Sequence, residues 1–257
     1  MPKLRSAGTD ARIRFLTYFV SAVLLAFALL AAPVHAQQTD VQRFDSFVGY
    51  SFLDSPHIGL FENGFGFQFG VRPRQWLSLG FDYTRSSGDL TLTPNLLLTS
   101  LQTTLGGELQ QLAAAGLVPA GYSLVIPAHS VTQTFAAGPQ LAYRHLKHVT
   151  LFLRPVFAGV IHESATPHPV DAIQNLVVSG FQQLGLVPAS GTKTDNTVFY
   201  GFGGGFDVLF TKHLGWRTQA DLVYDHLFND LLKDGRFTVR FAAGPCFNFG
   251  GNILKRN

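Results

Sequence analysis

Large apolar residues alternate with small or polar residues along most of the chain. In residues 64–72 every odd position is large and apolar, and every even position is glycine or polar. Neighbouring side chains of a strand point to opposite faces, so this period predicts strands with one apolar face. The pattern predicts eight strands, at residues 43–52, 64–72, 76–84, 131–144, 149–162, 197–210, 216–224 and 237–249.

Two architectures share this pattern, a soluble antiparallel sandwich and a membrane barrel. The non-apolar face is rich in glycine, alanine and serine, which suits a narrow barrel interior better than a water-facing sheet. The gaps between strands also alternate, being long at 53–63, 86–130, 163–196 and 225–235 and short near 73–74, 147–148 and 212–213. Outer-membrane barrels have short periplasmic turns and longer outer loops. We therefore expect an all-β, eight-stranded antiparallel up-and-down transmembrane β-barrel, with both mature termini in the periplasm.

An uninterrupted alternation assigns each side chain to the lipid or to the lumen. The lipid-facing set is Phe65, Phe67, Phe69, Leu77, Leu79, Phe81, Phe237, Val239, Phe241, Phe247 and Phe249. The polar lumen set is Asp45, Gln68, Asp82, Gln140, Arg144, Arg154, Asp207, Arg217, Asp221 and Arg240. Side chains can fill an eight-stranded barrel, and buried charges are costly unless paired. We favour a network of ion pairs that plugs the lumen, with an ion or proton pathway as the alternative.

The first 36 residues have the features of an export signal. Lys3, Arg5, Arg12 and Arg14 precede an apolar run over residues 15–32, and small or apolar residues lead to Ala36. This order predicts cleavage after Ala36, with an uncleaved signal anchor as the alternative. The expected mature domain, residues 37–257, then has 15 basic and 15 acidic residues, after 4 of 19 and 1 of 16 are removed. This balance gives no indication of a nucleic-acid partner.

Three features of the mature chain carry a family resemblance: the eight-strand rhythm, residues 201–208 (GFGGGFDV) and the ending at residues 244–249 (GPCFNF). On these features the chain resembles the OmpA/OmpX-like small outer-membrane β-barrel proteins, and its ending is similar to the assembly signal in the last strand of such barrels. The resemblance implies a protein that contacts outer-membrane lipid, is inserted by the barrel-assembly machinery and needs no cofactor. The implied role is structural, in envelope integrity, or an interaction at the cell surface.

The two longest gaps between strands resemble each other. Each carries apolar residues at helical spacing, at 101–112 and 173–184, followed by glycine and the residues Leu-Val-Pro-Ala. We expect a short amphipathic helix in each, ending at the glycine. The two helices are expected to pack together over the barrel mouth, with docking onto lipid or an extracellular partner as the alternative.

Candidate chemistry is sparse. His162 and Ser164 share one strand face and invite comparison with lipid A deacylases, which are eight-stranded barrels, but the alternation points both inward. We therefore expect no enzymatic activity, and we keep a narrow-pore channel and, less favoured, a lipid A-modifying enzyme as alternatives. The histidines show no ligand spacing, so no metal site is expected, and Cys246 is expected to be a small buried filler.

Overall fold

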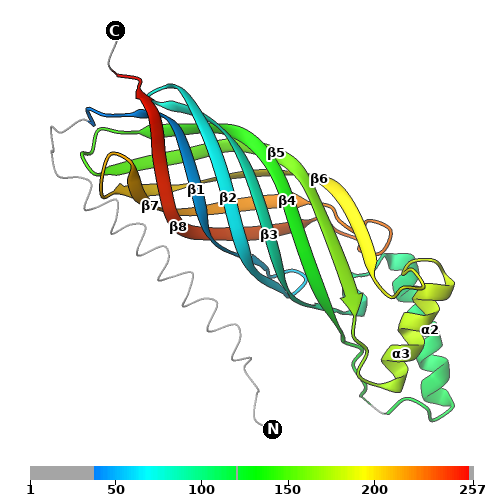
Figure 1. Cartoon of the computed structure of the whole chain (residues 1–257). Helices are drawn as coiled ribbons and strands as arrows, with labels where there is room; N and C mark the ends of the chain where they lie inside the picture. The colour runs from blue at the N-terminus through cyan, green and yellow to red at the C-terminus, as the bar shows by residue number, and fades with distance from the viewer. Residues whose placement is uncertain (1–37, 120, 255–257) are drawn as a thin grey trace. The chain divides into compact units, whose positions relative to one another are not determined.

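The structure is a computed structural model that describes residues 38–119 and 121–254. The predicted signal segment and its cleavage site at Ala36 lie outside the described residues. Eight antiparallel strands follow one another around a closed barrel in which β8 pairs back with β1 (Figure 1). The strands are β1 (Gln42–Ser55), β2 (Leu60–Arg74), β3 (Leu77–Leu92), β4 (Ile126–Tyr143), β5 (Val149–Pro167), β6 (Lys193–Leu209), β7 (Leu214–Asp225) and β8 (Arg236–Asn252).

The two ends of the barrel differ in their connections. The first and last strands meet at one end, where Gln42 pairs with Asn252 and the three short connections lie, and we call it the terminal end. The opposite end, which we call the helix end, carries η1 (Pro94–Leu96), α2 (Thr99–Ala114) and α3 (Ala172–Gln183), as Figure 1 shows. The predicted barrel with a helix in each long loop is confirmed.

The strands extend further toward the helix end than the alternation predicts. The predicted loop at 53–63 is wrong, because β1 and β2 stay paired as far as Ser55 and Leu60, leaving only the turn at 56–59. β3, β4, β5 and β6 are longer in the same direction. In these extensions both faces carry polar residues, as Ser86 inside and Asp89 outside illustrate. An alternation of apolar and polar residues appears in the sequence only when the two faces of a strand differ in polarity. The sequence therefore did not predict these extensions as strands.

Both helices end in the same way. Gly116 and Gly185 have positive φ values of 71° and 73°, a conformation that glycine adopts without steric cost. The next residue then donates its N–H back into the last turn, from Leu117 to the carbonyl of Leu112 and from Leu186 to that of Phe181. These are Schellman ends, which explains why the sequence around each glycine is shared.

The helices belong to one apolar cluster at the helix end, which we call the cap. Leu105 of α2, Phe181 of α3, and Leu227 and Leu231 of the β7–β8 connection are buried in it. The cluster continues into the barrel as far as Phe157. The two loops also touch through Tyr122, whose hydroxyl donates to Asp171 Oδ2 at 2.9 Å. Within the described ranges, no helix has the length and apolarity to cross a membrane.

Asp171 gives the cap a dependence on pH. Its Oδ1 accepts the N–H of Gln174 at 2.8 Å, and this hydrogen bond lowers the pKa of Asp171 below its usual 3.8. A lowered pKa means stabilisation that is complete above the unfolded-state pKa and lost as the pH falls through the folded-state value. We therefore expect Asp171→Ala to increase amide exchange in α3 severalfold at pH 7.

Hydrogen-exchange mass spectrometry, corrected for intrinsic rates, measures this. The wild type should show the same increase in amide exchange in α3 only below pH 3.8. Glu108→Ala, at an exposed acid in α2, is the matched control and should leave α3 unchanged. Equal exchange in Asp171→Ala and the wild type at pH 7 would show that this N-cap does not order the helix.

Candidate functional site: the polar lumen and the cap

The predicted lumen residues all lie inside the barrel. Each of the ten is buried: Asp45, Gln68, Asp82, Gln140, Arg144, Arg154, Asp207, Arg217, Asp221 and Arg240. They come from all eight strands and, in the case of Arg144, from the β4–β5 turn. A closed barrel therefore concentrates charges that are far apart in sequence.

Four of them form a central cluster, made of Asp82, Arg154, Asp221 and Arg240. Arg240 donates to Asp82 Oδ1 at 2.9 Å and to Asp221 Oδ2 at 2.7 Å. Arg154 reaches the same two carboxylates, at 3.3 Å from Asp82 and 2.9 Å from Asp221. Two guanidinium groups thus face two carboxylates across the interior, from strands β3, β5, β7 and β8. This geometry satisfies the condition under which buried charge is tolerated.

A second set, the terminal cluster, consists of Asp45, Arg72, Asp207 and Arg217. Arg217 donates to Asp207 Oδ1 at 2.7 Å and to Asp45 Oδ2 at 3.1 Å, and Arg72 lies 3.4 Å from Asp45 Oδ1. Gln68 joins the two clusters by accepting from Arg217 and donating to Asp82 Oδ2 at 2.8 Å. The network therefore runs continuously across the middle of the lumen.

Aromatic rings line these clusters. The Arg154 guanidinium carbon lies 4.1 Å from the centroid of Phe157, and that of Arg217 lies 4.9 Å from the centroid of Phe152. Both rings point into the barrel and are buried. A desolvated guanidinium over an aromatic face gains ~2 kcal/mol from the ring quadrupole. The rings also displace water from the paired charges.

Two predicted lumen residues stand apart from the clusters. Arg144 donates to the Gln75 carbonyl at 2.9 Å and to Thr150 Oγ1 at 3.0 Å, and it forms no ion pair with any described residue. Gln140 is buried, and its amide nitrogen has no hydrogen-bond partner within residues 38–119 and 121–254. The structure therefore does not bring all ten residues into one network.

Sequence reasoning missed five buried charges. Arg72 belongs to the predicted strand at residues 64–72, in which even positions face inward, so the alternation could have identified it. The other four form the helix-end cluster, made of Glu62, Glu163, Asp225 and Arg236. Arg236 donates to Asp225 Oδ1 at 2.7 Å and also pairs with Glu163, while Thr132 donates to Glu62 Oε1 at 2.8 Å. These four lie outside the predicted strands, so no inward face was assigned to them.

The charge of the lumen changes sign along the barrel. The central and terminal clusters each hold two carboxylates and two guanidinium groups, and Arg144 adds an unpaired positive charge near the terminal end. The helix-end cluster has three carboxylates around Arg236. One end of the lumen therefore carries an excess of positive charge and the other an excess of carboxyl groups.

A bulge reverses the predicted direction of His162 and Ser164. The pairing of β5 with β6 shifts register between Arg154 and Phe157, so odd positions beyond the bulge point inward. Glu163 is consequently fully buried, whereas His162 lies outside with its Nδ1 2.6 Å from Asn196 Oδ1. Ser164 is on the same outer face. The prediction that both residues point inward is wrong.

The predicted lipid-facing residues lie on the outer face. They alternate with buried residues, and Phe65 has the highest exposure among them at 70%. Phe69, Leu77 and Phe241 are less exposed than the rest of the set and are half-buried, because neighbouring side chains cover part of each. Phe69, for example, stacks against Phe44 with a centroid distance of 6.1 Å.

The outer apolar face ends abruptly toward the helix end. One outward-facing row across β3 to β6, at the edge of this apolar face, consists of residues paired in register: Tyr83, Phe135, Val160 and Val198. Two residues further along each strand, the outward row is polar, namely Arg85, Gln133, His162 and Asn196. The outer surface thus has an apolar band with a defined edge, and the barrel continues beyond it with polar faces.

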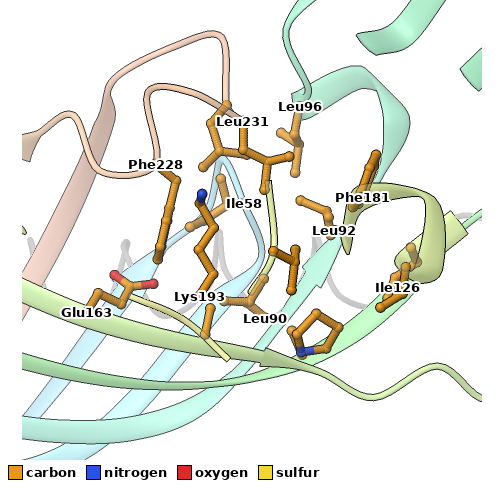
Figure 2. A pocket seen from close by; sticks show the side chains of 16 residues that line it. Ile58, Leu90, Leu92, Leu96, Ile126, Glu163, Phe181, Lys193, Phe228 and Leu231 are labelled. Carbon is orange, nitrogen blue, oxygen red and sulfur yellow. The ribbon is translucent and has the colours of Figure 1, made fainter. Parts of the chain in front are cut away.

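A small cavity lies under the cap. It has a volume of about 50 Å³ and is lined almost entirely by apolar side chains, with Glu163 and Lys193 on one side, as Figure 2 shows. Phe228 lines it with a φ of 54°, a left-handed conformation that is uncommon for a bulky residue. The described residues contain no group of His, Cys, Asp and Glu that could hold a metal ion. Cys246 is buried against Phe47 and Ala242.

Comparisons with known proteins find solved structures with a similar fold. Neither a scan against protein-family models nor a search of curated proteins finds a match. Solved structures that resemble the chain include Ail, the attachment invasion locus protein of Yersinia pestis, at 12% identity over 81% of this chain and 99% of that chain, with a TM-score of 0.43. The outer membrane protein OprG from Pseudomonas aeruginosa has 8% identity over 84% and 100%, with a TM-score of 0.45. Neisserial surface protein A has 10% identity over 80% and 96%, with a TM-score of 0.43.

The central cluster predicts a large loss of stability on removal of one partner. Arg240→Met leaves Asp82 and Asp221 to share Arg154, so we expect the free energy of unfolding to fall by ~3–5 kcal/mol. Equilibrium unfolding by guanidinium chloride in detergent micelles measures the change.

The control is Arg74→Met, which removes an exposed arginine from the end of β2. It should leave the unfolding midpoint within experimental error of the wild type. A midpoint for Arg240→Met that equals that of the control would show that the central pairs do not hold the barrel together.

Proposed function

We propose that this chain is an integral outer-membrane β-barrel protein with a plugged lumen, acting in envelope integrity or in an interaction at the cell surface. The observation that carries the proposal is the inversion of polarity across the barrel wall: exposed phenylalanines outside and paired charges inside. A soluble barrel would place its charges outside. Lipid is the solvent in which such an outer face is stable.

The outer band has the dimensions of a bilayer. On β4 the outward apolar stretch runs from Phe135 to Tyr143, within the ~9–11 residues that a tilted strand needs to cross the hydrocarbon. Trp76, Tyr143 and Trp216 are exposed around the terminal end, and Tyr200 and Tyr224 toward the other edge. Amphipathic rings at both edges match the aromatic girdles of membrane barrels.

We propose that the terminal end faces the periplasm and the helix end the outside. The short connections are at the terminal end, as in outer-membrane barrels. The last strand, with Phe247 and Phe249 exposed on its outer face, is the segment that the barrel-assembly machinery is expected to engage. On this orientation the polar barrel extension and the cap stand above the membrane surface.

The plugged lumen favours a structural role over a channel. Opening a path through the central cluster would require separating Arg240 from two carboxylates at 2.7–2.9 Å. Breaking one partner from such buried pairs costs ~3–5 kcal/mol, which disfavours spontaneous opening. The narrow-pore channel is the second hypothesis, and a lipid A-modifying enzyme is the third. For the third, His162 would have to activate a serine, but its Nδ1 lies beside Asn196 Oδ1, and no serine among the described residues hydrogen-bonds to it.

Planar bilayer recording separates the first two hypotheses. The purified protein should insert and show no resolved conductance steps at neutral pH, because charged side chains fill the lumen. Heat-modifiable gel migration of the same preparation verifies that the barrel is folded. Discrete, reproducible conductance steps from folded protein would establish the channel instead. Release of fatty acid from lipopolysaccharide would establish the enzyme.

A further inference from the structure

A pocket at the terminal end lies beside Arg144, the lumen arginine that forms no ion pair with any described residue. It has a volume of about 210 Å³. Its lining includes Gln75, Trp76, Ala142, Tyr143 and Arg144. A single water needs only ~10–15 Å³, so the pocket has room for a ligand of several heavy atoms.

Arg144 lines this pocket and has one donor without a partner. Its Nε and Nη1 are held by neutral acceptors, the Gln75 carbonyl and Thr150 Oγ1, at 2.9 and 3.0 Å. Its Nη2 is enclosed and has no hydrogen-bond partner in the described part of the chain, so an anion in the pocket would reach it after the side chain turns toward the pocket. A buried guanidinium nitrogen without an acceptor is costly, and an anion would remove that cost.

The surroundings leave Arg144 short of negative charge. The nearest carboxylates, Asp45 and Asp207, are already bound by Arg217 and Arg72. Burial, and next the positive charge of Arg72, lower the pKa of Arg144 to about 9, so the group is strained in its charged form yet still protonated at neutral pH. Within residues 38–119 and 121–254, the Arg144 guanidinium beside this pocket therefore has no carboxylate paired with it.

The remaining lining groups supply hydrogen-bond donors and an amphipathic wall. Trp76, Tyr143 and Gln75 line the pocket and carry an indole N–H, a hydroxyl and an amide, which are hydrogen-bond donors. Trp76 and Tyr143 are 51% and 53% exposed on the outer surface, where the polar part of a lipid meets its acyl chains.

We propose that this pocket binds a phosphate group, with the Arg144 guanidinium as its principal ligand. Phosphate suits the site because it offers several acceptor oxygens to a guanidinium and to neutral donors at once. The phosphate can belong to a phospholipid headgroup or be free in solution, and both present the same chemistry to Arg144. Binding of free phosphate does not depend on the membrane placement of the barrel, whereas binding of a lipid headgroup rests on the proposed function.

Trp76 reports on binding because it lines the pocket. The chain has two tryptophans, so Trp216→Phe leaves Trp76 as the sole reporter. The full barrel, in a non-ionic detergent and verified by heat-modifiable migration, is titrated with inorganic phosphate and, separately, with short-chain phosphatidic acid. Sodium chloride of equal ionic strength is the control for screening.

We expect a saturable change in Trp76 fluorescence. Arg144→Gln should raise the dissociation constant at least tenfold, whereas Arg74→Gln, an exposed arginine at the same end, should not change it. Ala142→Leu fills the pocket while keeping Arg144, and it should also abolish binding; it serves as the test if Arg144→Gln does not fold.

Saturation by the lipid at far lower concentration than by inorganic phosphate assigns the site to a headgroup, and comparable saturation assigns it to free phosphate. Either result supports the site. No saturation with either probe, or saturation unchanged in both Arg144→Gln and Ala142→Leu, overturns it.

Discussion

Closure of the sheet is the constraint on which the other features depend. Once β8 pairs with β1, no strand edge remains, and every side chain must point either into a narrow interior or outward. An arginine such as Arg217 on the inner face then has no route to water and must meet a carboxylate from another strand. The pairing of charges follows from the closed geometry rather than from local sequence, which is why Arg217 of β7 reaches Asp45 of β1.

Glycine makes this crowded interior possible. A Cβ on Gly201 would lie 2.3 Å from the ring of Phe157, and one on Gly49 would lie equally close to the ring of Phe47. The rings of Phe157 and Phe47 therefore each occupy the space beside a glycine, and Phe157 in turn packs against the guanidinium groups of Arg154 and Arg240. The glycine-rich inner face noted in the sequence is the space that the aromatic and charged side chains occupy.

The sequence predicted only those features that the spacing of apolar residues encodes. The eight strands and the inward direction of Asp82 or Arg240 follow from alternation, because the two faces differ in polarity there, and the two loop helices follow from apolar residues at helical spacing. Alternation does not say which acid meets which base, since that depends on strand order and tilt. It also failed at the β5 bulge, which turned Glu163 inward, and in the polar extensions, where Glu62 and Arg236 were assigned to loops.

The distribution of charge along the lumen indicates where functional contacts belong. The central cluster is balanced in charge, with two guanidinium groups against two carboxylates, so it offers a charged ligand little that its own partners do not already provide. The ends are different: near the terminal end Arg144 makes no ion pair with a described residue, and beneath the cap Glu163 and Asp225 pair with Arg236 while Glu62 adds a third carboxyl group. An unbalanced buried charge gains more from a new partner than a paired one does. Binding chemistry in this barrel is therefore expected at its two ends, on either side of a core that holds them apart.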